Sequence, residues 1–467
     1  MSETSLSDVL TAGGNPVEML RNSRQDAFVY PVVATEFSNW RDEQRAWRQD
    51  VVLFDQSHHM AELMVEGPDA ERLLSDLAIN SFKGFRPDKA KQFVACSPSG
   101  HVIGDNIMFY LAEHQLVLVG RPPSINWVQY HGETGGYDVQ VTKDMSSPAR
   151  PDGRAVNRRH YRFQIQGPKA PELLAKLNGG PLEDIRFFNM GRVNMGPHSV
   201  RALRHGMSGV PGLEFWGPYE ERDVIRQVIL EMGAEFGIRQ VGSRAYSTST
   251  LESGWIPSPL PAVYSDPALK AYRDWLPAKG YEATGPIGGS YVAPKIEDYY
   301  VTPYEIGYGP FVKFDHDFIG REALEAMTPE TQRRKVSLAW HPEDVARVQA
   351  SMLEPEGENF KYIEMPLSNY AASNYDRLEK DGRMVGVSMF SGYSYNERCF
   401  ISLATVEPDV KIGDEVTLTW GEPDGGTAKS TVEPHRQTTI RATVSPVPFS
   451  QVARESYAQS WRTAHAS

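Results

Sequence analysis

The sequence is poor in cysteine. Among its 467 residues only Cys96 and Cys399 are cysteines, and they stand far apart in the chain. Two distant cysteines cannot supply the dense disulfide framework of a small secreted domain, nor a zinc site built from cysteine. Because "MSETSLSDVL" also lacks the pattern of a secretory signal, we expect a protein of the reducing cytoplasm.

Long apolar runs and an excess of basic side chains are missing too. No stretch approaches the roughly 18 consecutive apolar residues that a membrane-spanning helix needs. The formal net charge is −12, with 48 Lys and Arg against 60 Asp and Glu, whereas binding to nucleic-acid phosphates calls for a basic face. We therefore expect neither a membrane nor a nucleic acid as a partner.

Common motifs of nucleotide binding, hydrolysis and metal binding are likewise absent. The segments "GYGPF" and "IGGSY" lack the third glycine and the helix start of a dinucleotide loop. The serine in "GMSGV" has the wrong spacing for a nucleophile elbow. His58 and His59 are adjacent, so on a strand they point to opposite faces and chelate one ion poorly. We expect no metal.

The patterns that are present indicate an α+β protein of more than one domain. Apolar positions in residues 220–237 recur with the period of a helix that ends at Gly237. Hairpin-like strands, rather than single buried strands, lie between such helices, so residues 1–325 are assigned to an α+β part. Short strands separated by Gly, Pro and Asp turns then predict an all-β barrel or jelly-roll-like domain over 326–467.

Residues 257–300 interrupt this pattern. The segment is rich in Pro, Gly and Tyr and shows little periodicity. A connection of this length inside a compact domain is usually functional or disordered, and the aromatic content favours an ordered loop. We expect this loop to form a lid over a mostly apolar pocket with a few placed polar groups.

Three residues stand out in segments that should be partly buried. Glu214 lies between apolar residues on a predicted strand, either in a site or facing outward from an edge strand. Arg121 follows the strand "LVLVG" and precedes two prolines, so it can hold a ligand carboxylate bidentately or form a structural salt bridge. Trp255 can stack on a flat ligand or belong to the core.

Several segments together resemble the glycine-cleavage T-protein family. They occur in that family's order and span nearly the whole chain: "FDQSHHM" (54–60), "GHVIGDNIMFY" (100–110), "FQIQGPKA" (163–170), "PGLEFWGP" (211–218), "TLESGW" (250–255) and "TPYEIGYGPFVKFDHDFIGREAL" (302–324). The resemblance implies a cloverleaf of three domains around a channel that binds tetrahydrofolate, the first two domains being interleaved. It also implies that Glu214 hydrogen-bonds the pterin ring. Gln164 and Trp255 would line the channel, with ordinary packing as the alternative.

Departures from the family pattern point to one branch. The family's Asp-Asp pair reads Gly104-Asp105 here, and Tyr246 and Thr250 stand where the family carries arginines. Other segments resemble tetrahydrofolate-dependent aromatic O-demethylases: "LRNS", "VYPVV", "EFSNWR" and "SRAYSTSTLESGWIPSPLP". Members of that branch move the methyl group of a lignin-derived methoxylated acid (vanillate, 3-O-methylgallate or syringate) to folate, giving 5-methyltetrahydrofolate and a phenol.

The resemblance also assigns roles in an aromatic site. A tyrosine with the ordinary pKa of about 10 is protonated at neutral pH, so Tyr246 can give a proton to the departing phenolate oxygen, which an arginine could not do. Tyr30 and His59 are expected to bind the ring oxygens or to support Tyr246; the alternative for His59 is a core histidine bonded to backbone. Arg121 is expected to face either the substrate carboxylate or the folate.

The main expectation is therefore an enzyme, a tetrahydrofolate-dependent methyltransferase that takes a small aromatic acid. Two alternatives stay open at this point. One is an aminomethyl- or methyltransferase that acts on another small donor, although Gly104 counts against aminomethyl transfer. The other is a folate-binding protein without catalysis.

Overall fold

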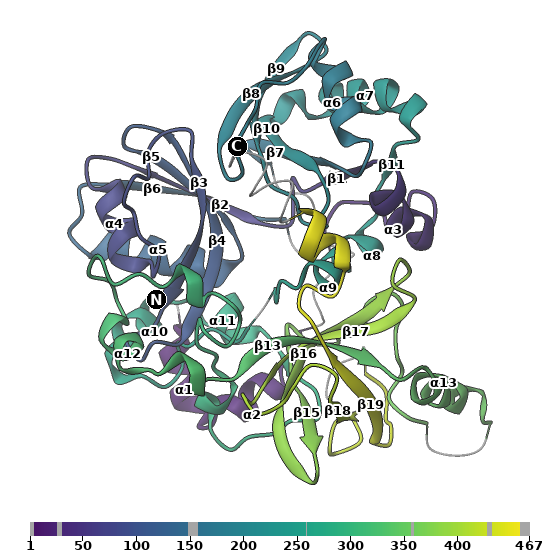
Figure 1. Ribbon diagram of the computed structural model, residues 1–467. Coiled ribbons are helices and arrows are strands. Elements are labelled where there is room, and N and C mark those ends of the chain that lie inside the picture. The colour runs from purple at the N-terminus through teal and green to yellow at the C-terminus, as the bar shows by residue number, and fades with distance from the viewer. Residues whose placement is uncertain are drawn as a thin grey trace.

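The computed structural model describes residues 4–25, 30–147, 157–257, 259–355, 359–426 and 432–457. The chain forms three lobes around a common centre, and each lobe is built on a sheet of its own (Figure 1). The segment that follows the last strand lies at this centre (yellow in Figure 1). The arrangement confirms the expected cloverleaf. Within the described ranges, no helix is both long and apolar enough to span a membrane.

The first lobe contains a six-stranded sheet, whose order shows how the first two lobes interleave. Strand β1 lies between β11 and β7, although the strands of the second lobe separate β1 from β7 in the chain. Only the pairing of β1 with β11 is parallel among the named strands of this sheet. In sheet order the strands are β11 (Arg239–Gln240), β1 (Val52–Asp55), β7 (His160–Gln166), β10 (Gly212–Pro218), β9 (His198–Leu203) and β8 (Met190–Met195).

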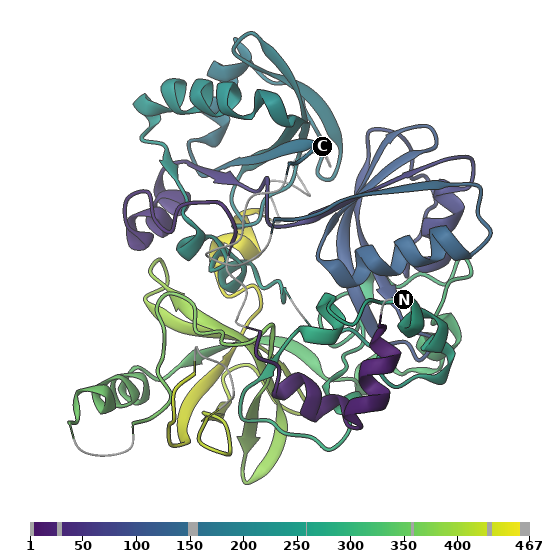
Figure 2. The same ribbon diagram turned by 180° about the vertical axis from the view of Figure 1, so that it is seen from behind.

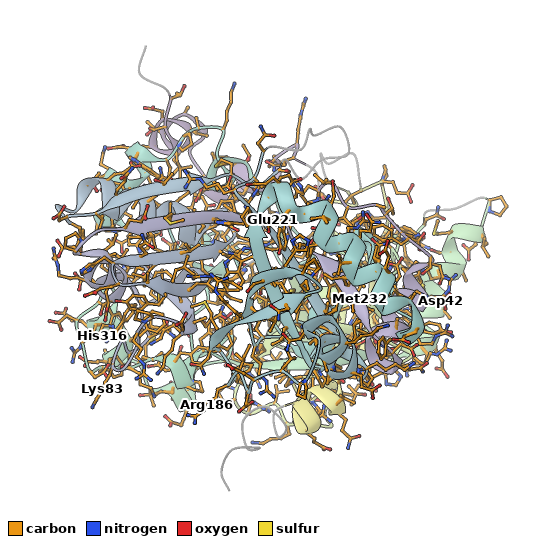
Figure 3. All side chains as sticks on the ribbon, turned by 90° about the horizontal axis from the view of Figure 1, so that it is seen from above. Asp42, Lys83, Arg186, Glu221, Met232 and His316 are labelled. Carbon is orange, nitrogen blue, oxygen red and sulfur yellow. The ribbon has the colours of Figure 1, made fainter. Side chains whose placement is uncertain are left out.

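Two helices cover one face of this sheet, α6 (Ala170–Asn178) and α7 (Arg222–Gly233). Helix α7 runs from the labelled Glu221 toward the labelled Met232 in Figure 3. A short 3-10 turn follows, and Gly237 ends it in a left-handed conformation with a φ of 74°, as the sequence predicted. Helices α6 and α7 pack against one face of the sheet. The polar side chains of the opposite face therefore point toward the centre of the molecule.

The second lobe is a five-stranded antiparallel sheet with helices α4 (Ala70–Leu77) and α5 (Pro122–Thr134). Helix α5 begins with two prolines, whose fixed φ suits the first helical turn. In sheet order the strands are β3 (Ala90–Cys96), β4 (Val102–Ala112), β5 (Gln115–Gly120), β2 (Ala61–Glu66) and β6 (Gln140–Asp144). Strand β4 lies next to α5, which places residues of both elements at the centre.

The third lobe is a closed barrel of six strands, which confirms the expected C-terminal β domain. In barrel order the strands are β13 (Arg334–Trp340), β17 (Cys399–Val406), β16 (Arg383–Ser394), β15 (Asp376–Lys380), β18 (Glu415–Trp420) and β19 (Thr438–Ser445). The lobe also carries one helix that the sequence interpretation did not include, α13 (Pro342–Ala350). Its start is favoured by Pro342 at the first position and by two acidic residues in the first turn.

Residues 257–300 are a packed connection rather than a lid over most of their length. They form helices α10 (Lys270–Trp275) and α11 (Tyr281–Thr284) and the short strand β12 (Ile287–Gly288), which pairs with β14 (Ser373–Asn374). Four of their aromatic side chains, those of Tyr264, Tyr272, Tyr299 and Tyr300, are buried in the core shared with the second lobe. The N-terminal helices α1 (Leu6–Gly13) and α2 (Pro16–Arg21) lie beside them (purple in Figure 2), and α12 (Arg321–Ala326) follows later in the chain.

Three helices join the lobes near the centre: α3 (Trp40–Gln49), α8 (Ser243–Tyr246) and α9 (Ser249–Ser253). The carboxylate of Glu252, on α9, is inaccessible to solvent. It accepts hydrogen bonds from Trp47 at 3.2 Å and Arg48 at 2.9 Å on α3, and from Ser394 at 2.6 Å and Asn396 at 3.1 Å in the third lobe. One side chain therefore connects an N-terminal helix, the segment of Tyr246 and the barrel.

Replacing Glu252 should strongly destabilise the protein. In Glu252→Leu the buried donors lose their acceptor, and removing one partner of a buried ion pair costs about 3–5 kcal/mol. We expect a loss of about 3 kcal/mol in the free energy of unfolding, measured in urea. The matched control is Glu330→Gln, an exposed glutamate; equal effects of the two variants would contradict the role of Glu252.

Candidate functional site

A cavity of about 970 Å³ opens at the centre. The first lobe contributes Gln164 and Glu214 to its wall, and the second lobe contributes Asp105 and Arg121. The segment after α9 and the C-terminal segment complete the wall, the former with Trp255. Of residues 257–300 only Pro257, Pro259 and Tyr281 line it among the described positions. The expected lid is thus reduced to three residues.

One wall of the cavity carries an ionised carboxylate. Glu214, in the middle of β10, is 5% exposed and accepts hydrogen bonds from Arg162 at 2.9 Å and Gln164 at 3.3 Å. Gln164 lies directly opposite Glu214 because β7 and β10 pair in this register. Burial alone would raise the pKa of Glu214, but the hydrogen bond from His205 and the charge of Arg162 outweigh burial and hold the pKa below its ordinary value.

Arg162 connects this carboxylate to a second one. Its Nε donates to Glu62 Oε1 at 2.6 Å, while its Nη1 donates to Glu214. The guanidinium also lies 4.8 Å from the ring centre of Phe109 and 5.4 Å from that of Trp216, so it is held by aromatic faces as well as by charge. Arg162 is 4% exposed. This fixed cation positions the Glu214 carboxylate at the cavity wall.

A second carboxylate lies on the wall of the second lobe. Asp105, on β4, accepts hydrogen bonds from Tyr308 at 2.8 Å, from Trp255 Nε1 at 3.1 Å and from Gln92. Burial raises the pKa of Asp105 although these three hydrogen bonds oppose the rise. The indole N–H of Trp255 is therefore anchored, and its ring forms part of the cavity wall, where it was expected.

Gly104 precedes this carboxylate and lies close to helix α5. A Cβ atom at this position would lie 3.1 Å from the Cβ and the backbone nitrogen of Ser124 on α5. A side chain at this position would therefore require Ser124 to shift by a few tenths of an ångström.

The structure brings three of the predicted residues together in one aromatic cluster. The Tyr30 ring stacks on the His59 ring with centres 4.6 Å apart, and the Tyr30 and Tyr246 ring centres are 4.3 Å apart. The Tyr30 hydroxyl donates to the Asp55 backbone carbonyl at 2.5 Å. Tyr30 therefore contacts both neighbours through its ring, and its hydroxyl group also forms a hydrogen bond with that of Tyr246.

His59 is held in its neutral form. Its Nδ1 lies 3.2 Å from the backbone oxygen of Gln56, which can only accept, so Nδ1 carries the proton and Nε2 is an acceptor. Nε2 lies 3.2 Å from the Tyr246 hydroxyl. Burial, reinforced by the charge of Arg121, lowers the pKa of His59 to about 3. At neutral pH the Tyr246 hydroxyl therefore faces an uncharged acceptor.

The hydroxyl of Tyr246 lies behind the wall of the cavity. Tyr246 and Tyr30 are buried and do not line the cavity, whereas Gln56, His59 and Met207 do, among the residues that the structure describes. The hydroxyl receives a hydrogen bond from Gln56 Nε2 at 2.8 Å and donates toward Met207 Sδ at 2.9 Å. Burial raises the pKa of Tyr246, which the hydrogen bond from Gln56 opposes, so the hydroxyl is protonated at neutral pH.

Arg121 occupies the position that the sequence indicated. It follows the last residue of β5 and precedes helix α5, with an extended backbone, and it lines the cavity. Its positive charge adds to the lowering of the pKa of His59 and opposes the burial-driven rise in the pKa of Asp105, so its field reaches both the aromatic cluster and the second-lobe wall. Whether it meets a substrate carboxylate or the folate stays a prediction.

Sequence reasoning missed four residues of this site: Gln56, Asp105, Arg162 and Met207. Gln56 stands inside "FDQSHHM", a segment whose adjacent histidines are the more obvious candidates for a site. Arg162 alternates with Gln164 along β7, a period-2 signal that places both on one face of the strand. This alternation could have identified Arg162 from the sequence. No local pattern marks Met207, because it contacts Tyr246 only in the folded protein.

Comparisons with known proteins identify the family. A family model described as the GCVT N-terminal domain matches residues 11–258. The chain belongs to the glycine-cleavage T-protein family. Within it, the chain is 50% identical over 460 residues to syringate O-demethylase of Sphingobium sp. strain SYK-6, covering 98% of this chain and 99% of that protein.

Other members of the T-protein family are more distant. Sesamin methylene transferase of Sinomonas sp. strain No.22 is 30% identical over 402 residues, which is 82% of each chain. Aminomethyltransferase of Clostridium botulinum strain Okra is 26% identical over 309 residues, 65% of this chain and 70% of that one. The crystal structure of aminomethyltransferase T from Bartonella henselae shares the fold, with a TM-score of 0.58 and 17% identity over 96% of this chain and 98% of that chain.

The buried histidines make stability depend on pH. Burial lowers the pKa of His58 to about 4 and that of His59 to about 3, below the reference value of about 6.5 for an unfolded chain. Between about pH 6.5 and 4 the unfolded chain therefore binds more protons, and stability falls as the pH falls.

In the His59→Gln variant one such histidine is removed. We therefore expect its free energy of unfolding to fall less steeply as the pH decreases in that range, by about 1.4 kcal/mol per pH unit. Unfolding in urea at pH 4.5, 5.5 and 6.5 measures the slope. An unchanged slope would show that His59 is protonated in the folded protein.

Proposed function

We propose that this T-protein family member is a tetrahydrofolate-dependent O-demethylase of methoxylated aromatic acids such as syringate, vanillate or 3-O-methylgallate. The observation that carries the proposal is the cluster of Tyr246, His59 and Gln56 beside the cavity: an uncharged proton donor among uncharged partners. The near full-length similarity to syringate O-demethylase supports it. Such an enzyme would serve the breakdown of lignin-derived aromatics in the cytoplasm.

The wall around Glu214 fits the pterin ring of tetrahydrofolate. The ring's amino edge presents N–H donors, and a buried carboxylate held ionised by Arg162 is a strong acceptor for them. Gln164 beside it can donate and accept, and Trp255 offers a flat apolar face. When bound, tetrahydrofolate supplies N5 as the nucleophile for the methyl group.

The reaction balances without an oxidant or a metal. The methyl carbon forms a bond to N5 as its bond to the ether oxygen breaks, and the electron pair of that bond goes to the oxygen. N5 loses its proton, and the oxygen gains one, so an aryl methyl ether and tetrahydrofolate give a phenol and 5-methyltetrahydrofolate. The protein must align the three atoms, supply the oxygen with a proton and exclude water.

Tyr246 is assigned as the proton donor. Its raised pKa keeps the hydroxyl protonated, and the neutral His59 imposes no charge on the developing phenolate. Gln56 donates to the same hydroxyl oxygen, which stabilises the tyrosine as it gives up its proton. Arg121, at the cavity wall, is assigned to the substrate carboxylate, with folate as its alternative partner.

Purified protein with tetrahydrofolate should convert syringate, vanillate or 3-O-methylgallate to the corresponding phenol, detected by liquid chromatography. Tyr246→Phe should reduce kcat by about 10²–10⁴-fold, the usual contribution of general acid catalysis, and should leave the Kd for tetrahydrofolate unchanged. Tyr370→Phe, in the barrel, is the matched control. If none of the three acids reacts with the unaltered protein, the proposal is wrong; turnover of a glycine-cleavage donor would favour aminomethyl transfer.

Arg162→Met should weaken folate binding. The variant leaves Glu214 without its cation, and hydrogen bonds to charged groups contribute about 1.5–3 kcal/mol, so we expect the Kd to rise about tenfold or more at pH 7. Loss of the cation raises the pKa of Glu214, so binding should strengthen again as the pH rises. Calorimetric titration from pH 6 to 9 measures both effects. Arg201→Met, on β9 of the same sheet, is the control; equal losses in both variants would contradict the role of Arg162.

A further inference from the structure

Two hydrogen-bond donors converge on the sulfur of Met207. The Tyr246 hydroxyl lies 2.9 Å from Met207 Sδ, and Gln56 Nε2 lies 3.0 Å from it. Both separations are those of hydrogen bonds to an oxygen atom, whereas a thioether sulfur is a weak acceptor. Two good donors at the edge of a cavity therefore point at a position where an oxygen atom would be a better acceptor than the sulfur.

We propose that the ether oxygen of the methyl donor replaces Met207 Sδ at this point, so that Gln56 is a second catalytic donor beside Tyr246. The inference rests on the proposed function. As the bond between methyl carbon and oxygen breaks, the oxygen gains negative charge at a place where an O–H and an N–H already point. Preorganised donors of this kind stabilise a developing oxyanion.

The hydrogen-bond pattern allows the Tyr246 hydroxyl proton to be donated to the position of Met207 Sδ. Gln56 Nε2 carries two N–H groups and contacts both the Tyr246 oxygen and Sδ. Its 7% exposure leaves few competing water contacts. The acceptors in reach of the Tyr246 proton include Sδ at 2.9 Å and the neutral His59 Nε2 at 3.2 Å. An ether oxygen in place of the sulfur receives both donors, and the Tyr246 proton passes to it.

Met207 can leave this place by side-chain rotation alone. Its backbone lies in the loop between β9 and β10, which is fixed at the next residue, because the Ser208 backbone N–H and hydroxyl both donate to Gln166 Oε1. Gly209 continues the loop with a φ of 67° and packs on Ala453. A methionine side chain has three rotatable bonds and adapts readily, so the sulfur can move while the loop stays.

The test compares Gln56→Leu and Gln56→Glu with the unaltered protein. Both variants lack the amide donor, and we expect kcat to fall about 10²-fold, as for other single oxyanion donors, with the Kd for tetrahydrofolate unchanged. A series of ring-substituted methoxybenzoates gives the dependence of kcat on the pKa of the leaving phenol. This dependence should be steeper in Gln56→Leu, because less of the developing charge is stabilised. In Gln56→Glu activity should rise as the pH falls from 8 to 6, since only the protonated acid can donate.

An unchanged dependence on the leaving phenol, with all substrates slowed equally, would overturn the proposal and leave Gln56 a structural residue. Met207→Leu gives a second readout. It keeps the apolar volume but removes the competing acceptor, so KM for the aromatic donor should fall roughly fivefold; a loss of kcat like that in Gln56→Leu would assign the sulfur itself to the reaction. The unaltered protein is assayed first: no turnover there contradicts the proposed function, whereas normal turnover with insensitive variants contradicts only this inference.

Discussion

The buried carboxylate of Glu252 holds together the elements on which the site depends. It accepts from Trp47 and Arg48 of an N-terminal helix and from Ser394 and Asn396 of the barrel. The same short segment carries Tyr246 one helix earlier. Because a buried charge is costly unless every partner is in place, the position of Tyr246 is tied to the correct packing of helix α3 against the barrel.

Two parts of the cavity differ in the groups that form them: charged side chains surround Glu214, whereas the groups in contact with the Tyr246 hydroxyl are uncharged. Around Glu214 the wall alternates carboxylate and guanidinium, and Arg162 keeps Glu214 ionised for a ligand rich in N–H donors. Around Tyr246 the partners are a neutral imidazole, an amide and a thioether. These neutral donors respond mainly to the charge that develops during ether cleavage, while Arg121, whose charge also acts on this cluster, is proposed to bind the substrate carboxylate. The two halves of the cavity thus suit the two substrates of one methyl transfer.

Sequence reasoning succeeded where a pattern repeats locally or matches a family. The period of residues 220–237 predicted α7, the short strands after residue 330 predicted the barrel, and the T-protein resemblance predicted the interleaving that places β1 beside β7. It failed where the partner lies far away in the chain. Aromatic residues of 257–300 were expected over the cavity, but their composition does not say which surface they cover, and they pack into the second lobe's core. Gln56 and Met207 meet only because separate loops converge on Tyr246.

The central claim, that this chain moves an intact methyl group from an aryl ether to tetrahydrofolate, is tested most directly by isotopic labelling. Syringate carrying trideuterated methoxy groups is incubated with the purified protein and tetrahydrofolate, and the folate product is analysed by mass spectrometry. Direct displacement at carbon breaks no C–H bond, so 5-methyltetrahydrofolate should carry all three deuterium atoms of one methoxy group. Loss of deuterium from that methyl group, or recovery of the label as formaldehyde with none on folate, would contradict it.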